Sequence, residues 1–351
     1  MKIRSFWVVL LAAVTFWACE TQPSDTPASA SETASGELNL YTHRHYEADK
    51  QLIAAFTEAT GITVNVVNAS ADELILKMEN EAEQSPADVL ITVDAGRLER
   101  ARNKDLFQSV SSPVLEANIP AHLREQGGHW FGFTKRARLI VYDKEAGVPA
   151  NVETYDDLAA PAMKGKVLIR SSGNIYNQSL MAAIIANKGE EGAKAWAAGV
   201  VSNMARAPKG NDRDQMKAVI AGEGQVAIVN SYYLGHLLNS QDEAEVAVGE
   251  RIGVLFPNQD DRGTHINISG AGVAKHAPNK DNAIKFIEYL SGKEAQALLA
   301  SSNYEFPVNP EAETSELLSS WGLFVEDELA LEKLGAFNKQ AVLTFDEVGW
   351  K

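Results

Sequence analysis

From Leu38 onward, short apolar runs alternate with longer segments whose apolar positions recur every three or four residues. Two such segments, 46–61 and 71–84, have the periodicity of amphipathic helices. The short runs around them have the length and β-branched content of strands: 38–42, 62–68 and 87–93. This order of strand, helix, strand, helix and strand predicts a doubly wound α/β sheet with helices on both faces.

A second set of the same kind follows further along the chain. Strands are predicted at 166–172 and 225–231. Helices are predicted at 177–189, 192–204, 214–224 and from 232 onward. No short-period repeat is present, so a solenoid is not expected.

Two extended β-rich segments, 129–144 and 264–275, lie where the pattern changes from one set to the other. We expect them to cross between two α/β lobes, with a cleft between the lobes as the default ligand site. The N-terminal lobe is predicted to be discontinuous, and so is the C-terminal lobe. Their expected residues are 38–133 with about 270–310, and 134–269 with about 311–351.

The N-terminal segment has the pattern of a secretory signal. Lys2 and Arg4 precede an apolar run that is short for a membrane-spanning helix, so a signal peptide is expected at 1–18. Cys19, the only cysteine, follows at once and has the position of a lipid-modified cysteine, although an incidental cysteine remains the alternative. Residues 19–37 are rich in Ser, Thr, Pro and Ala and are predicted to form a flexible tether. A body outside the cytoplasm, in the periplasm or held near a membrane, follows from these features.

Composition and motifs narrow the function classes. The formal net charge of −15 makes nucleic acid an unexpected partner. The chain has no Gly-x-Ser-x-Gly, Walker or His-Glu-x-x-His motif, and its single cysteine lies in the signal region. We therefore predict a binding protein rather than an enzyme; a hydrolase or transferase on a similar fold is the less supported alternative.

Polar side chains follow three predicted strands and one crossing segment. Any one of them is more often structural than ligating, but all three strand-end loops carry tyrosine. Strand ends of an α/β sheet meet at one edge, so these loops are expected to face one site. The candidates are His43, His45 and Tyr46, then Asn174, Tyr176 and Asn177, then Tyr232, Tyr233 and His236, with Lys135, Arg136 and Arg138 on the crossing.

Several phenols at one site favour a hard cation over other ligands. A sugar site would use stacking tryptophans, and only Trp130 is expected near these loops. A phosphate site would use glycine-rich helix starts, of which "RSSGN" is a weak version. Phenolates are oxygen anions once a metal has displaced their protons, and a neutral imidazole is a plausible further ligand. Tyrosines with histidine and no thiol point to ferric iron rather than zinc or copper(I).

At these residues the chain resembles the ferric-ion-binding periplasmic proteins of bacterial ABC iron importers, in particular the cyanobacterial FutA type. The likeness covers 38–351 and includes "HYEADKQL", "SPADVLITVD", "WFGFTKRAR", "IRSSGNIYNQS", "NSYYLG" and "FPNQDDRGTHINISGAGVAK". It implies a two-lobed, hinge-closing periplasmic binding fold of type II.

The resemblance also implies a set of ligands. The tyrosines that match the family's iron ligands are Tyr46, Tyr176, Tyr232 and Tyr233. His45 matches a residue that binds the metal or lies close to it, and Arg136 matches a second-shell residue. His236 stands where relatives often carry arginine, which leaves the second-shell charge open.

The expected function is capture of iron between the lobes and its delivery to the permease of an ABC importer. Fe³⁺ is favoured as the transported ligand, and Fe²⁺ is left open. Tyr176, Tyr232 and Tyr233 would lie on one lobe, with Tyr46 and His45 on the other, and the protein is expected to be a monomer. The alternatives are a binding protein for a small anion or polar solute and an extracellular iron sensor.

Overall fold

The computed structural model describes residues 36–351. The expected signal peptide, the predicted lipid attachment at Cys19 and nearly all of the tether lie outside the described residues. No helix between residues 36 and 351 combines the length and the apolar character that a membrane crossing needs.

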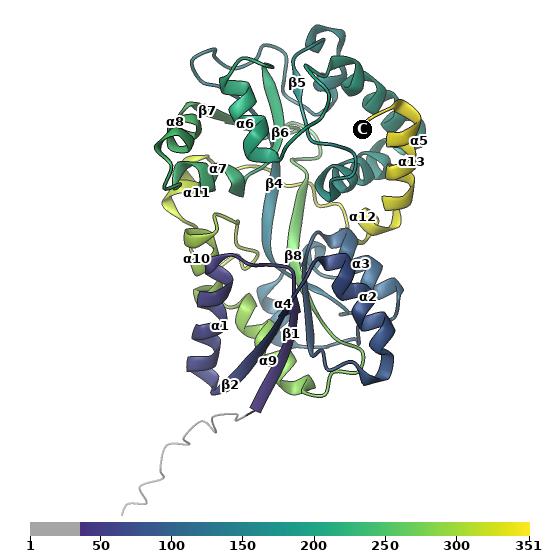
Figure 1. Ribbon diagram of the computed structural model, residues 1–351, viewed down its shortest axis with the longest axis vertical. Helices are drawn as coiled ribbons and strands as arrows, with labels where there is room; N and C mark the ends of the chain where they lie inside the picture. Colours follow the sequence, from purple (N-terminus) through teal and green to yellow (C-terminus); the bar gives the residue numbers. More distant parts are fainter. Residues whose placement is uncertain (1–35) are drawn as a thin grey trace, which may run out of the picture. The chain divides into compact units, whose positions relative to one another are not determined.

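The described part of the chain is built on one mixed eight-stranded sheet, shown in Figure 1. The strand order is β2-β1-β3-β8-β4-β6-β5, and β7 pairs with β4. β1 is parallel to β2 and β3, whereas β8 is antiparallel to both of its neighbours, β3 and β4. The strands are β1 (Gly36–Thr42), β2 (Ile62–Asn68), β3 (Val89–Val93), β4 (Phe131–Asp143), β5 (Val167–Leu168), β6 (Val226–Asn230), β7 (Ile252–Leu255) and β8 (Ile266–Val273).

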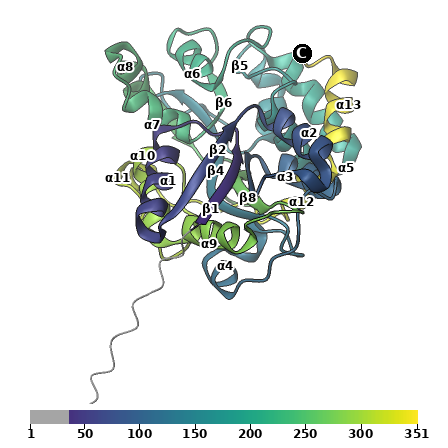
Figure 2. The same ribbon diagram turned by 60° about the horizontal axis from the view of Figure 1, so that its bottom comes forward.

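Helices cover both faces of the β1–β3 end of the sheet, as Figures 1 and 2 show. Helices α1, α9 and α10 pack on one another on one side, while α2 and α3 contact the strands from the other side. We call this group of elements the first lobe. Its helices are α1 (Glu47–Thr60), α2 (Ala71–Glu81), α3 (Ala95–Asn103), α4 (Pro113–Asn118), α9 (Lys280–Ser291) and α10 (Lys293–Ser302).

The β5–β7 end of the sheet carries the other helices, and we call this group the second lobe. α6 packs on β6 and β4, α7 packs on α8, and α13 packs along α5. Its helices are α5 (Ile175–Asn203), α6 (Asp212–Ile220), α7 (Tyr232–Leu238), α8 (Glu243–Arg251), α11 (Glu316–Ser320) and α13 (Asn338–Val348), whereas the short helix α12 (Glu332–Ala336) packs on both α3 and α5.

The long strand β4 joins the two lobes. It pairs with β8 through Phe131–Ala137 and then with β6 through Arg138–Tyr142. The predicted crossing segments 129–144 and 264–275 are therefore the paired strands β4 and β8. The two-lobed α/β architecture is confirmed, while the residue boundaries given above for each lobe stay a prediction.

Local sequence explains where the first helices begin and end. Ser70 caps α2 by accepting a hydrogen bond from the Glu73 amide, and the Glu73 carboxylate accepts one from the Ser70 amide. Gly61 ends α1 in the left-handed conformation, with φ of 73°, which glycine adopts without a steric penalty. The apolar face of α1 is buried, and Phe56 packs edge-on against Phe286 of α9 with ring centroids 4.9 Å apart.

Two predicted elements of the second lobe differ in the structure. The strand expected at 166–172 is reduced to Val167–Leu168, because the Asn177 amide donates to the carbonyl oxygens of Arg170 and Ser171. A side chain thus takes the place of a neighbouring strand there. The helices expected at 177–189 and 192–204 follow one another within α5, with a break at Gly189, whose φ is 72°.

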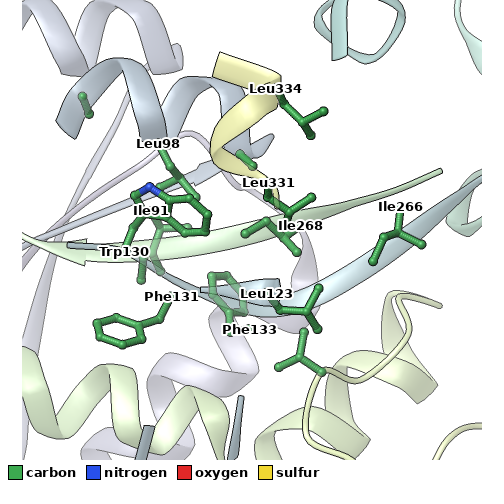
Figure 3. Packing of buried hydrophobic residues seen from close by; sticks show 14 of the residues in the cluster. Ile91, Leu98, Leu123, Trp130, Phe131, Phe133, Ile266, Ile268, Leu331 and Leu334 are labelled. Carbon is green, nitrogen blue, oxygen red and sulfur yellow. The ribbon is translucent and has the colours of Figure 1, made fainter. Parts of the chain in front are cut away.

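The first-lobe core includes Trp130, which Figure 3 shows beside Ile91 and Leu98. Trp130 is fully buried, and its indole nitrogen donates to Oε2 of Glu99 at 3.4 Å. Trp130 thus lies in the first-lobe core, and the expectation that it lies near the strand-end loops stays a prediction. It directly precedes β4, at the end of that strand that pairs with β8 rather than with β6.

Asp94, directly after β3, ties the two lobes together beside the sheet. Its carboxylate accepts hydrogen bonds from the Gly96 amide at the start of α3, from Ser179 Oγ of α5 and from Asn267 Nδ2 of β8. Its φ of 86° lies in a region that costs a residue with a side chain of the order of 1–3 kcal/mol. Three hydrogen bonds from three elements hold this buried residue in that conformation.

Candidate metal centre

The side chains of β4 alternate between two environments where the strand passes from one lobe to the other. Arg136 and Arg138 are buried on one face of the strand. Lys135 points the other way and forms an ion pair with Glu326 at 2.5 Å. The structure therefore separates Lys135 from the arginines with which the sequence had grouped it.

Tyr176 lies at the start of α5, against these arginines. Asn174 caps the helix by accepting a hydrogen bond from the Tyr176 amide. Three guanidinium carbons lie over the phenol ring, at 5.4 Å for Arg136, 5.9 Å for Arg138 and 5.7 Å for Arg170. Cations at these distances attract the ring face and stabilise negative charge nearby.

The charges of the three arginines are only partly balanced. Arg138 and Arg170 share the buried carboxylate of Asp212, at 3.0 and 3.3 Å. Arg138 also donates to the side-chain oxygens of Asn177 and Asn230. The Nη1 and Nη2 atoms of Arg136 are buried and have no hydrogen-bond partner among residues 36–351. Arg136 thus brings an unsatisfied positive charge close to Tyr176.

Tyr232 and Tyr233 converge on the same place. They begin α7 directly after β6, and their ring centroids are 4.2 Å apart. The hydroxyl oxygens of Tyr176 and Tyr232 are 3.2 Å apart, within hydrogen-bonding distance. Burial raises the pKa of Tyr232 and that of Tyr233, and the nearby phenol of Tyr176 raises both further. The adjacent tyrosines therefore share one site rather than two faces of a sheet.

Tyr46 reaches this group from the first lobe. It is the residue before α1, and its ring meets Tyr232 edge-on with centroids 6.4 Å apart. Burial raises the pKa of Tyr46 to about 12, and the Tyr176 phenol and the Glu305 carboxylate act in the same direction. All four predicted tyrosines are thus brought together, with three from the second lobe and one from the first.

Two histidines stack on either side of Tyr46. The His45 ring lies 5.3 Å from the Tyr46 ring at an interplanar angle of 17°, and the His236 ring lies 5.4 Å away at 16°. His45 is exposed, whereas His236 is partly buried and has an Nε2 atom without a partner among residues 36–351. Burial lowers the pKa of His236, so this imidazole is neutral at neutral pH. A neutral imidazole can accept a proton or a metal ion.

His43 is half-buried close to arginine side chains. Burial lowers its pKa to about 3, and the guanidinium groups of Arg97, Arg44 and Arg136 act in the same direction. Its Nδ1 atom is buried without a partner in the described part of the chain. Asn174 and Asn177 likewise have structural contacts, as helix cap and as partner of Arg138.

The sequence did not reveal a buried ion-pair network beneath Tyr46. Arg44 pairs with Asp49 at 2.7 Å and with Glu305 at 2.9 Å, and it also donates to Ser269 Oγ. Burial opposes ionisation of Glu305, but the Arg44 guanidinium outweighs it and lowers the pKa of the carboxyl to about 2. Arg44 and Glu305 are 261 positions apart in the chain, so no local pattern connects them.

The chemistry of the site follows from its donors. Among residues 36–351 no group of three His, Cys, Asp or Glu side chains is placed to hold a metal ion, so phenol oxygens are the main donors available. Buried phenols with raised pKa values are protonated at neutral pH until a cation displaces the protons. The unpaired Arg136 beside them stabilises negative charge on the oxygens.

A family model described as bacterial extracellular solute-binding protein matches residues 51–325. The chain belongs to this family. This solute-binding protein is 47% identical over 351 residues to iron uptake protein A1 of Synechocystis, an alignment that covers 100% of this chain and 97% of the relative. The name of this relative describes iron uptake and not an enzymatic reaction.

Two solved structures are similar to this solute-binding protein in both sequence and fold. One is FutA of Trichodesmium in complex with iron and citrate, which is 47% identical, has a TM-score of 0.87 and aligns over 90% of this chain and 100% of that one. The other is a ferric binding protein from Campylobacter jejuni, 46% identical with a TM-score of 0.85, over 90% of this chain and 100% of that one. Both confirm the two-lobed solute-binding fold.

Proposed function

We propose that this solute-binding protein captures iron, as Fe³⁺, through tyrosine phenolates between its two lobes. The observation that carries the proposal is the convergence of Tyr176, Tyr232 and Tyr233 with Tyr46 from the other lobe. Oxygen anions are the ligands that a hard trivalent cation prefers. The names of the relatives support the same cation, because they describe iron uptake and ferric binding.

The proposed ligands have different environments. Tyr176, Tyr232 and Tyr233 would supply phenolates from the second lobe, and Tyr46 would supply one from the first. His45 is exposed beside Tyr46 and would complete the ligand set only if its ring turned toward the metal. His236 packs against both Tyr46 and Tyr232, and we assign it to the second shell.

Charge balance explains the arginine at the site. Four phenolates around Fe³⁺ carry one negative charge in excess. The Arg136 guanidinium, whose Nη1 and Nη2 atoms are buried near Tyr176 without a partner among residues 36–351, offsets that charge. Fe²⁺ would leave two negative charges in excess, which makes the ferric ion the better match for this set.

Iron binding would bring the two lobes closer together. A ligand held by residues of both lobes favours the conformation in which those residues are close together, because only that conformation offers the full set of donors. The closed form would then be recognised by the permease of an ABC importer. The other finer points that we propose are a monomeric protein held outside the cytoplasm by a lipid on Cys19 and by the tether.

Two alternatives use the same site. A small anion could bind the Arg136 guanidinium and accept hydrogen bonds from the tyrosines, and a sensor would bind iron without transport. The four clustered phenols, one buried and three half-buried, favour the cation, because protonated phenols offer an anion weaker hydrogen bonds than charged donors do.

Metal analysis combined with calorimetry tests the proposal. The purified protein is expected to retain one iron per chain against a weak chelator. Titration of Fe³⁺ in two buffers of different ionisation enthalpy is expected to show proton release, because the phenols lose their protons on binding. A protein that takes up no iron, or binds it without releasing protons, would overturn the proposal.

A further inference from the structure

The two lobes touch at a glycine close to the tyrosines. Gly235 lies in α7, two residues after Tyr233 and one before His236. Tyr304 follows α10, the first-lobe helix that packs on α1, and its ring meets His236 edge-on with centroids 5.4 Å apart. Gly235 is therefore close in the chain to the proposed ligand Tyr233. Tyr304 follows a helix that packs on α1, the helix that begins directly after the proposed ligand Tyr46.

The approach of the two residues leaves no room for a side chain at position 235. A methyl group on Gly235 would lie 2.6 Å from Cδ2 of Tyr304 and closer still to its Cγ and Cβ. Those separations are far below the normal distance between carbon atoms. The ring of Tyr304 therefore lies directly on the backbone of α7.

Helix geometry gives no reason for a glycine at this position. Gly235 lies inside α7 and is absent from the residues with positive φ. Alanine is a better helix former than glycine in such a position. Within residues 36–351, the atoms that a side chain at residue 235 would meet first all belong to Tyr304.

Tyr304 is held firmly on its own side. Its φ of 57° is uncommon for a residue with a side chain, so neighbouring contacts must fix it there. Those contacts come from the buried residues on either side, since Asn303 Nδ2 donates to Glu305, and Glu305 is bound by Arg44. Arg44 in turn lies two residues before Tyr46.

We propose that the contact of Tyr304 with Gly235 is the stop that sets how far the two lobes close. The stop thereby fixes the distance from Tyr46 to Tyr232 and Tyr233. Metal coordination tolerates deviations of only about 0.2 Å in ligand distance, so a stop displaced by one methyl group spoils the site. Both residues are positioning residues, because they act through the tyrosines. The inference rests on the proposed iron-binding function.

The test compares Gly235→Ala with two double variants and a matched control. In Gly235→Ala/Tyr304→Gly every clashing atom of Tyr304 is removed, and glycine suits the left-handed backbone at 304. In Gly235→Ala/Tyr304→Ala the Cβ atom of residue 304 remains, and so does part of the clash. The control is Gly192→Ala, in α5, where the added methyl meets only the side chain of Lys188.

Three quantities are measured for each protein: the iron dissociation constant, the visible spectrum of the iron complex, and the radius of gyration by X-ray scattering with and without iron. Gly235→Ala is expected to bind iron about 10-fold or more weakly, with an altered spectrum and little compaction on binding. Its ligand-free form is expected to melt like the wild type, because the open lobes avoid the clash. Tyr304→Gly is expected to restore binding and compaction in the double variant, and Tyr304→Ala to restore much less.

Two results would overturn the inference alone. One is a Gly235→Ala protein with wild-type affinity and compaction. The other is a loss of affinity that Tyr304→Gly does not reverse. Failure of the wild type and of Gly192→Ala to bind iron at all would overturn the proposed function together with the inference.

Discussion

The two lobes contribute unequally to the tyrosine site. The second lobe supplies Tyr176, Tyr232 and Tyr233, already in contact, with a hydroxyl pair 3.2 Å apart and guanidinium groups over the Tyr176 ring. The first lobe supplies Tyr46 alone, placed at the start of a helix above a buried ion pair. The second lobe therefore holds three of the four tyrosines in mutual contact, and in the proposed function the first lobe brings the fourth into place when the lobes close.

The largest effect is expected from the second-lobe tyrosines. Replacing Tyr232 and Tyr233 together with phenylalanine keeps the rings and removes two oxygen donors. Iron affinity should fall by more than the roughly 10–100-fold that is typical when only an outer-shell partner is lost. Competition with a chelator of known affinity measures the loss.

Tyr142→Phe is the matched control for that variant. Tyr142 lies on β4, but its ring packs against Gly253 in the second lobe, away from the other tyrosines. The Tyr142→Phe protein should bind iron with the same affinity as the wild type. Unchanged iron affinity in the Tyr232→Phe/Tyr233→Phe protein would show that these two phenols do not bind the iron.

The next largest effect is expected on the stability of the protein, from the buried Arg44–Glu305 ion pair beneath Tyr46. Glu305→Gln leaves the Arg44 guanidinium buried without one of its carboxylate partners. Loss of one member of a buried pair costs about 3–5 kcal/mol, so the ligand-free protein should unfold at a clearly lower urea concentration. Glu328→Gln is the control, because it changes an exposed carboxylate. Its free energy of unfolding should stay within about 0.5 kcal/mol of that of the wild type.

The pH dependence of the Arg44–Glu305 pair has a definite sign. The pKa of Glu305 is lowered to about 2 in the folded protein, whereas an unfolded glutamate titrates near about 4.3. The stabilisation is therefore present above about pH 4.3 and is lost as the pH falls toward 2. Glu305→Gln should lack this part of the acid dependence, and an identical acid profile in the two proteins would contradict it.

A smaller effect is expected from Tyr46→Phe. The second-lobe donors remain, so the variant should still bind iron, more weakly than the wild type but less weakly than the Tyr232→Phe/Tyr233→Phe protein. It should also compact less on binding, because the first lobe no longer supplies a phenolate. Affinity and X-ray scattering together check this result. A loss equal to that of the Tyr232→Phe/Tyr233→Phe protein would contradict the unequal division of the site between the lobes.

The smallest effect is expected from Arg136→Gln. A cation over an aromatic ring contributes about 0.5–2 kcal/mol, so iron affinity should fall by about 2- to 30-fold. Removing the positive charge also makes the phenols harder to ionise, so the pH of half-maximal binding should rise. Lys135→Gln, on the opposite face of β4, should leave that pH unchanged. A downward shift for Arg136→Gln would contradict the proposed charge balance.

Local sequence pattern accounts for most of the secondary structure. Short apolar runs predicted β1, β2 and β3 of the first lobe, and helical periodicity predicted α1 and α2, each of which buries one regular face. The same reasoning overestimated β5, where the Asn177 side chain rather than a strand satisfies the backbone. A side chain can take over the hydrogen bonds of a neighbouring strand only where folding brings it to the backbone, so the sequence pattern does not reveal it.

The site was predictable to the extent that it lies at strand ends. Tyr46, Tyr176, Tyr232 and Tyr233 each follow a predicted strand, and strand ends meet in an α/β sheet. The network of Arg44 with Glu305 and the contact of Gly235 with Tyr304 were not predictable. Both join segments that are distant in sequence, and the segment with Tyr304 and Glu305 directly follows α10, which packs against α1.

The visible absorption spectrum of the iron-loaded protein tests the central claim most directly. Coordination of Fe³⁺ by phenolates creates a charge-transfer band, so the wild type is predicted to be coloured. Replacement of the three second-lobe tyrosines by phenylalanine is predicted to abolish the band under the same loading conditions. An iron-loaded wild type without visible absorption, or a band that survives in the triple variant, would contradict the account.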